Sequence, residues 1–121
     1  RPLGLLGGRI DEGETPLACA KRELMEEAGL EAKDWQLLEV NEPHVKMDWK
    51  VYYFIARNCV KVARPRPDEG EKIRIRPVNL KKFIELITSG KYQGGEFVAN
   101  ILRMRLEPRK LEEFKRKLFK T

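Results

Sequence analysis

Three closely spaced glutamates are the residues of this 121-residue chain whose types and positions could do chemistry. Glu26 and Glu27 follow Glu23 by three and four residues, so on a helix all three carboxylates share one face. Like charges at this spacing repel each other, and a bound divalent cation removes that repulsion. Carboxylate oxygens on a rigid helix suit Mg²⁺ or Mn²⁺, whereas one histidine and two cysteines provide no cluster for zinc. The alternative is a solvated helix face without a metal.

A glycine-rich loop and the helix after it must position these carboxylates. Residues 7–14 contain three glycines and predict a loop. Thr15 can cap a helix and proline follows it, so the sequence predicts a helix over 16–28, which Gly29 ends. The loop and the helix therefore form one unit around the glutamates.

Glu14 and Arg22 form a second feature of the same segment. Glu14 lies beside the helix N-terminus, where a negative charge is favourable. If the loop folds back, this carboxylate reaches Arg22, which would fix the loop against the helix and direct backbone carbonyls toward a metal.

The segment GRIDEGETPLACAKRELMEEAGL, residues 8–30, resembles the Nudix box, Gx5Ex7REUxEExGU with U aliphatic. No consensus position is missed. The nine specified positions are Gly8, Glu14, Arg22, Glu23, Leu24, Glu26, Glu27, Gly29 and Leu30. The resemblance implies an α/β fold, a mixed sheet between helices as an α/β/α sandwich, in which the box forms a loop-helix-loop. It also implies an enzyme that cleaves a nucleoside diphosphate linked to another moiety, with water and Mg²⁺ or Mn²⁺.

The resemblance also assigns roles within the box. Glu23 and Glu27 look like metal ligands, and Glu26 looks like either a ligand or the base that activates water. The carbonyl of Gly7, just before the box, resembles a backbone metal ligand. Glu14 and Arg22 would be the orienting pair.

Outside the box, an acidic loop bears on the substrate. Residues 68–71 resemble the loop that carries the catalytic base in Nudix enzymes that hydrolyse ADP-ribose, with Glu71 favoured and then Glu69. An ordinary acidic turn is the alternative. His44, the single histidine, is a weaker candidate for a substrate contact.

These features favour hydrolysis of ADP-ribose or an ADP-sugar to AMP and a sugar phosphate. Three alternatives remain open: a MutT-like nucleoside triphosphate pyrophosphohydrolase, an RNA 5′ pyrophosphohydrolase, and a nucleotide sensor without catalysis. The complete set of glutamates argues against the sensor, which has no need of three carboxylates on one face.

The rest of the chain predicts a single domain over 1–121 with mixed strands and helices. Strands are expected over 35–40, 49–59 and 71–78. Further helices are expected over 80–89 and 97–106, and a basic helix over 108–121. Only six residues precede Gly7, so the strands that Nudix domains place before the box are expected to be missing, and the native form is expected to have an N-terminal extension. The resemblance to the ADP-ribose group, whose members are commonly dimers joined through their N-terminal strands, implies a homodimer.

The net charge and the number of cysteines indicate which binding partners and which cellular compartment to expect for the protein. The net charge is +6, and residues 108–121 carry six basic residues against two glutamates. These basic residues are explained by a solvent-exposed helix face, and the alternative is that they bind RNA. No stretch approaches the ~20 apolar residues of a membrane span, and the two cysteines suit packing as reduced thiols, so a cytoplasmic protein without a membrane partner is expected.

Overall fold

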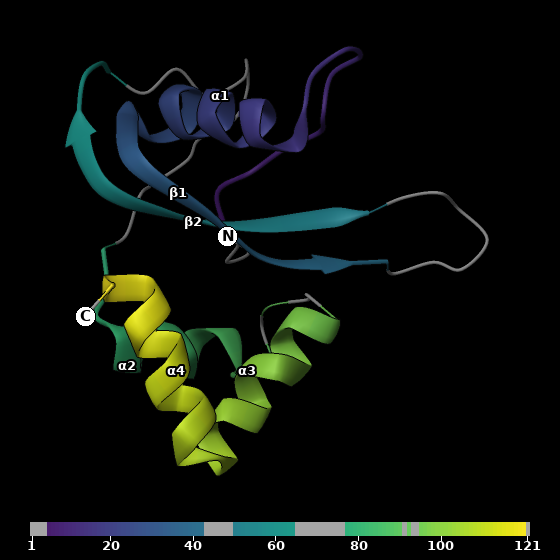
Figure 1. Ribbon diagram of the computed structural model, residues 1–121, viewed down its shortest axis with the longest axis vertical. Coiled ribbons are helices and arrows are strands. Elements are labelled where there is room, and N and C mark those ends of the chain that lie inside the picture. The colour runs from purple at the N-terminus through teal and green to yellow at the C-terminus, as the bar shows by residue number, and fades with distance from the viewer. Residues whose placement is uncertain (1–4, 43–49, 65–76, 91, 93–94, 121) are drawn as a thin grey trace. The chain divides into compact units, whose positions relative to one another are not determined.

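The computed structural model describes residues 5–42, 50–64, 77–90, 92 and 95–120. A two-stranded antiparallel sheet and four helices make up its regular structure (Figure 1). In chain order the elements are α1 (Pro16–Ala28), β1 (Leu30–Asn41), β2 (Val51–Lys61), α2 (Leu80–Ile87), α3 (Glu96–Leu106) and α4 (Pro108–Phe119). These elements confirm the mixed α/β fold class. Among the described residues, no helix is both long and apolar enough to cross a membrane.

The chain divides into two units by its internal contacts, and the first contains α1 and the adjoining parts of both strands. The Thr15 hydroxyl caps α1 by accepting a hydrogen bond from the Ala18 N–H at 3.1 Å. Leu24 and Ala28 of α1 and Ile55 of β2 are buried in this unit. Between the strands, the buried Arg57 donates to the Asp34 carboxylate at 2.8 Å and to the Gln36 side chain.

Gly29 ends α1 and joins it to the sheet. Its φ of 67° lies in the left-handed region, and its carbonyl accepts hydrogen bonds from the N–H groups of Val62 and Ala63 at 2.9 and 3.2 Å. A Cβ at position 29 would lie 2.1 Å from the Ala63 carbonyl oxygen. Only glycine satisfies both the backbone angle and this close approach.

Replacing Gly29 by alanine should therefore lower the free energy of unfolding by about 2–4 kcal/mol, from the left-handed conformation and the clash together. Gly90 is a matched control, because its φ is 87° but a Cβ there would meet nothing within 4 Å. Gly90→Ala should cost only about 1–2 kcal/mol. Urea unfolding measures both, and equal losses would contradict the role given to the Ala63 contact.

The second unit contains the three C-terminal helices and the remaining parts of the strands. The Asn79 side chain caps α2 by accepting from the Lys82 N–H at 2.8 Å. Pro108 begins α4 immediately after α3, and these two helices pack around Ile101 and Phe114, which are 1% and 2% exposed. Tyr53 of β2 stacks on Phe97 of α3, with ring centroids 4.2 Å apart. Buried apolar side chains thus hold α3 and α4 together, and the Tyr53–Phe97 stack joins α3 to β2.

Several sequence predictions changed in detail. The first strand runs from Leu30 rather than residue 35, and Cys59 is exposed rather than packed, while Cys19 is buried as expected. Most of the strand expected over 71–78 lies outside the described residues. The single domain over 1–121, lacking its first strands, stays a prediction.

Candidate active site

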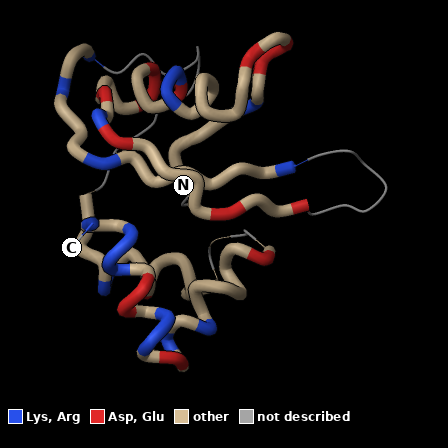
Figure 2. Tube along the Cα trace, in the orientation of Figure 1, with Lys and Arg blue, Asp and Glu red and all other residues tan. Residues whose placement is uncertain are grey.

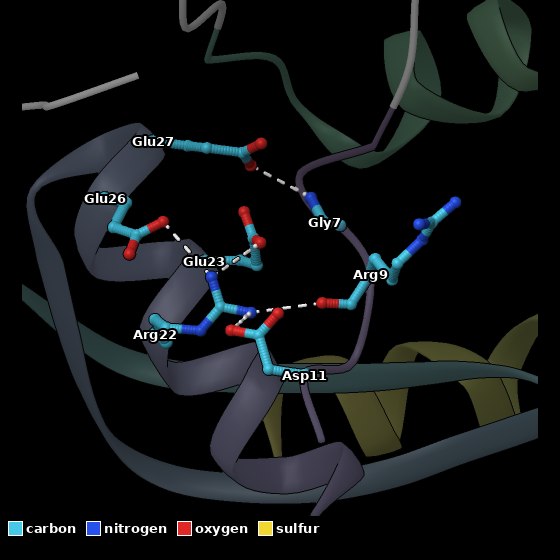
Figure 3. A pocket seen from close by; sticks show the side chains of 8 residues that line it. Gly7, Arg9, Asp11, Arg22, Glu23, Glu26 and Glu27 are labelled. Carbon is cyan, nitrogen blue, oxygen red and sulfur yellow. Dashed lines mark hydrogen bonds and ion pairs between the residues drawn. The ribbon is translucent and has the colours of Figure 1, made fainter. Parts of the chain in front are cut away.

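Helix α1 and the loop before it border a half-open cavity of about 440 Å³. Figure 3 shows carboxylates of α1 facing the loop across this space. The lining residues are Gly7, Gly8, Arg9, Asp11, Arg22, Glu23, Glu26 and Glu27. Four of them are acidic and two are basic, so the cavity attracts cations.

Arg22 holds the Glu14 carboxylate with both arms of its guanidinium. Its Nε donates to Glu14 Oε2 at 2.9 Å and its Nη2 to Glu14 Oε1 at 3.1 Å. Glu14 also accepts from the Asp11 N–H at 3.0 Å. The Arg22 hydrogen bonds, followed by the Asp11 N–H, lower the pKa of Glu14 from 4.5 to about 2. The ionised Glu14 therefore stabilises the fold. This stabilisation is complete above pH 4.5, the ordinary pKa of a glutamate, and is lost as the pH falls toward 2.

The same guanidinium also reaches the metal-ligand candidates. Its Nη1 donates to Glu23 Oε1 at 3.0 Å and to Glu26 Oε2 at 3.3 Å. Its Nη2 donates to the Arg9 carbonyl at 3.1 Å and lies 3.4 Å from Asp11 Oδ2. The Glu14 hydrogen bonds, with the charges of the surrounding carboxylates, raise the pKa of Arg22. One side chain therefore orients the loop and two of the three glutamates (Figure 3).

The loop backbone approaches the helix closely on the opposite side of the cavity. The Gly7 N–H donates to Glu27 Oε2 at 2.9 Å. A Cβ at Gly8 would lie 2.3 Å from Glu23 Oε1, so a side chain at this position would displace that carboxylate. Below the loop, the buried Cys19 thiol lies 3.5 Å from the Arg9 carbonyl oxygen and 3.9 Å from that of Gly8. The close approach to Glu23 explains the glycine at position 8, whereas a Cβ at Gly7 would meet nothing within 4 Å.

The donor set suits a hard divalent cation. Three carboxylates and a cavity with an excess of negative charge match the oxygen ligands that Mg²⁺ and Mn²⁺ prefer. Within the part of the chain that the structure describes, no three Asp, Glu, His or Cys side chains are arranged around one point as ligands. Their oxygens instead engage Arg22 and the Gly7 N–H. To bind an ion, Glu23 and Glu27 would have to turn from Arg22 and the Gly7 N–H toward it.

The comparison with known protein families decides the classification. The family model described as NUDIX domain matches residues 1–101. The chain belongs to the Nudix family. It is also similar to a viral protein, the mRNA-decapping protein g5R of African swine fever virus (isolate Pig/Kenya/KEN-50/1950), with 27% identity over 106 residues. The match covers 84% of this chain but 42% of the viral protein, so the chain spans less than half of that relative's length.

The structure brings together the candidate residues of the Nudix box and Gly7 just before it. These are Gly7, Glu14, Arg22, Glu23, Glu26 and Glu27. Three other candidates, His44, Glu69 and Glu71, lie outside the described residues. Sequence reasoning missed Asp11, whose carboxylate joins the Arg22 ion pairs and whose N–H fixes Glu14. The sequence feature that could have identified Asp11 is its position three residues before Glu14 in the same turn.

Proposed function

We propose that this Nudix chain hydrolyses the pyrophosphate bond of a nucleoside diphosphate linked to another moiety. The observation that supports this most is the single guanidinium that holds both the loop and the carboxylates of α1 around an acidic cavity. Bound Mg²⁺ or Mn²⁺ would neutralise the pyrophosphate charge, polarise phosphorus and lower the pKa of water. A sensor without catalysis needs no such set of oriented carboxylates.

Each side chain then has a definite task. Glu23, Glu27 and the carbonyl oxygen of Gly7 would hold the cation. The backbone N–H of Gly7 already donates to Glu27. Among the glutamates that Arg22 contacts, Glu26 lies farthest from the guanidinium, at 3.3 Å, and its side chain is 39% exposed, against 12% for Glu23. It is therefore the box carboxylate most able to turn toward a water molecule and accept its proton. Glu14 and Arg22 keep the loop in register with the helix.

Two substrate classes follow from different observations. The acidic loop over 68–71 supports ADP-ribose or an ADP-sugar, with AMP and a sugar phosphate as products. The similarity to a protein named for mRNA decapping supports an RNA 5′ end instead. Product analysis with ADP-ribose, nucleoside triphosphates, dinucleoside polyphosphates and capped RNA separates these classes. Release of pyrophosphate from a triphosphate would favour the MutT-like alternative, and no turnover of any of them would overturn the proposal.

The identity of the base gives a separate prediction. If Glu71 accepts the proton, Glu71→Gln should lower kcat by roughly 10²–10⁴-fold with little change in KM, because the acceptor acts in the transition state. Glu69→Gln is the matched control in the same acidic loop and should keep most of the activity. Parental kinetics for Glu71→Gln would leave Glu26 as the base.

We further propose that the protein acts in the cytoplasm as a homodimer. Both cysteines are free thiols, as a reducing compartment would keep them. Light scattering after gel filtration tests the assembly, and a fully active monomer of this chain would refute the dimer.

A further inference from the structure

The net positive charge of the chain resides in its C-terminal third. Residues 80–120 contain eleven Lys and Arg against five Asp and Glu, whereas residues 1–79 contain fourteen of each kind. The excess of +6 therefore belongs to the helical segment alone. Figure 2 shows Lys and Arg distributed along the C-terminal helices, with fewer acidic positions among them. An electrostatic surface of this sign suits a polyanionic partner.

The arginines of α3 and α4 carry this charge without internal compensation. Arg103, Arg105, Arg109 and Arg116 are all exposed, and none forms an ion pair with any residue in the described ranges. Lysines of α4 differ in this respect, because Lys110 pairs with Glu107 at 2.9 Å and Lys115 with Glu112 at 3.6 Å. The guanidinium groups of these four arginines are thus available to phosphates, whose geometry they match.

Two of these arginines are already oriented by neutral partners. Arg103 donates to the Asn100 side-chain oxygen at 3.0 Å, and Arg105 donates to the Thr88 hydroxyl at 3.1 Å. Each uses one Nη1 group in this way. Because the partners are uncharged, they restrict the side chains without neutralising them.

An exposed aromatic ring lies beside the arginines of α4. Phe119 is 62% exposed and follows Arg116 by three residues, so the two share a helix face. Arg109 precedes Arg116 by seven residues and lies on the same side of α4, about 10 Å along the axis. A row of guanidinium groups next to an accessible aromatic face suits a single-stranded nucleic acid, in which phosphates contact the cations and an unpaired base stacks on the ring.

We infer that the exposed face of α4 that carries Arg109, Arg116 and Phe119 binds single-stranded RNA, with Arg103 and Arg105 of α3 adding to the positive charge of the same helical hairpin. The hairpin presents this surface on a packed support, because Ile101 and Phe114 are buried on its inner side. The inference deepens the proposed function by selecting RNA as the class of substrate. Glu113 lies one turn from Arg109 on the same side of α4 and repels phosphates, so it limits the affinity.

A 5′-hydroxyl oligouridine with a fluorescent 3′ label tests binding alone, because it contains no pyrophosphate to cleave. Its affinity for the full chain should fall steeply with salt. The double variant Arg109→Gln with Arg116→Gln should reduce the slope of log K against log salt by about 1.4, the value for two lost phosphate contacts on a single strand. Phe119→Ala should weaken binding roughly fivefold or more, and Glu113→Gln should tighten it.

Matched variants distinguish RNA binding by this surface from nonspecific attraction by the positive charge of the whole chain. Lys33→Gln with Lys61→Gln removes two exposed cations from β1 and β2 and should leave the slope unchanged. Arg109→Lys with Arg116→Lys should retain it, and circular dichroism checks that each variant keeps its helices. An unchanged salt slope in Arg109→Gln with Arg116→Gln would overturn the inference. So would an equal reduction of the slope in Lys33→Gln with Lys61→Gln. Binding to anionic lipid vesicles without binding to the oligonucleotide would also overturn it and assign a membrane surface. RNA binding without hydrolysis of any substrate would contradict only the proposed function.

Discussion

Replacing Glu27 by glutamine is expected to lower kcat/KM by about a thousandfold or more while the fold survives. Glutamine removes the negative charge that would hold the cation, and a thousandfold loss corresponds to about 4 kcal/mol of transition-state stabilisation. Its side-chain oxygen can still accept from the Gly7 N–H, which Glu27 contacts at 2.9 Å, so the loop keeps its anchor. Steady-state kinetics with Mg²⁺ measures the loss, and thermal unfolding shows that stability is kept.

The control for this variant is Glu31→Gln, which removes an exposed carboxylate just beyond the box and should leave turnover unchanged. A chelator should abolish the activity of the parent chain, and added Mg²⁺ or Mn²⁺ should restore it. Undiminished turnover in Glu27→Gln, or activity that persists after chelation, would refute the metal assignment.

Replacing Arg22 by methionine should reduce kcat/KM by roughly 10²–10³-fold and the free energy of unfolding by about 1–2 kcal/mol. The change removes the hydrogen bonds to Glu14, Glu23 and Glu26 and leaves these carboxylates to repel each other. Arg22→Lys should regain part of the stability but little activity, because one ammonium group cannot grip Glu14 with two arms and also reach the other two.

Binding of Mn²⁺, measured by calorimetry without substrate, separates positioning from a merely structural role. It should weaken in both Arg22 variants, including the more stable Arg22→Lys. Lys21→Met removes the neighbouring exposed cation of α1 and should change neither binding nor turnover. Parental metal affinity and activity in Arg22→Met would show that the orienting role is wrong.

The box helix could be predicted from the sequence because its boundaries depend on local residues. Thr15, Pro16 and Gly29 set the two ends of α1, and the structure places both ends where the sequence predicted them. The start of β1 escaped prediction because Glu31 and Lys33 are poor strand formers. Hydrogen bonds from distant Val62 and Ala63 to Gly29 fix the sheet there. Such contacts join residues far apart in the chain and leave no local pattern.

The exposure of Cys59 has a similar origin. Asn58 adopts a φ of 56°, which interrupts the alternation of β2, and the four residues 58–61 are exposed. A single left-handed residue inside a strand changes which side chains face the core, and an apolar run does not reveal it. Asp11 was missed for another reason: its part depends on where the folded loop carries it, next to Arg22.

The guanidinium of Arg22 acts as a counterion built into the chain. It lets the acidic loop and helix fold together before any ion arrives, since the carboxylates of Glu14, Glu23 and Glu26 already have a cation beside them. Under the proposed function, folding and metal loading would then be separate events. The metal-free chain should fold on its own, and adding Mg²⁺ or Mn²⁺ to it should start turnover without a refolding step.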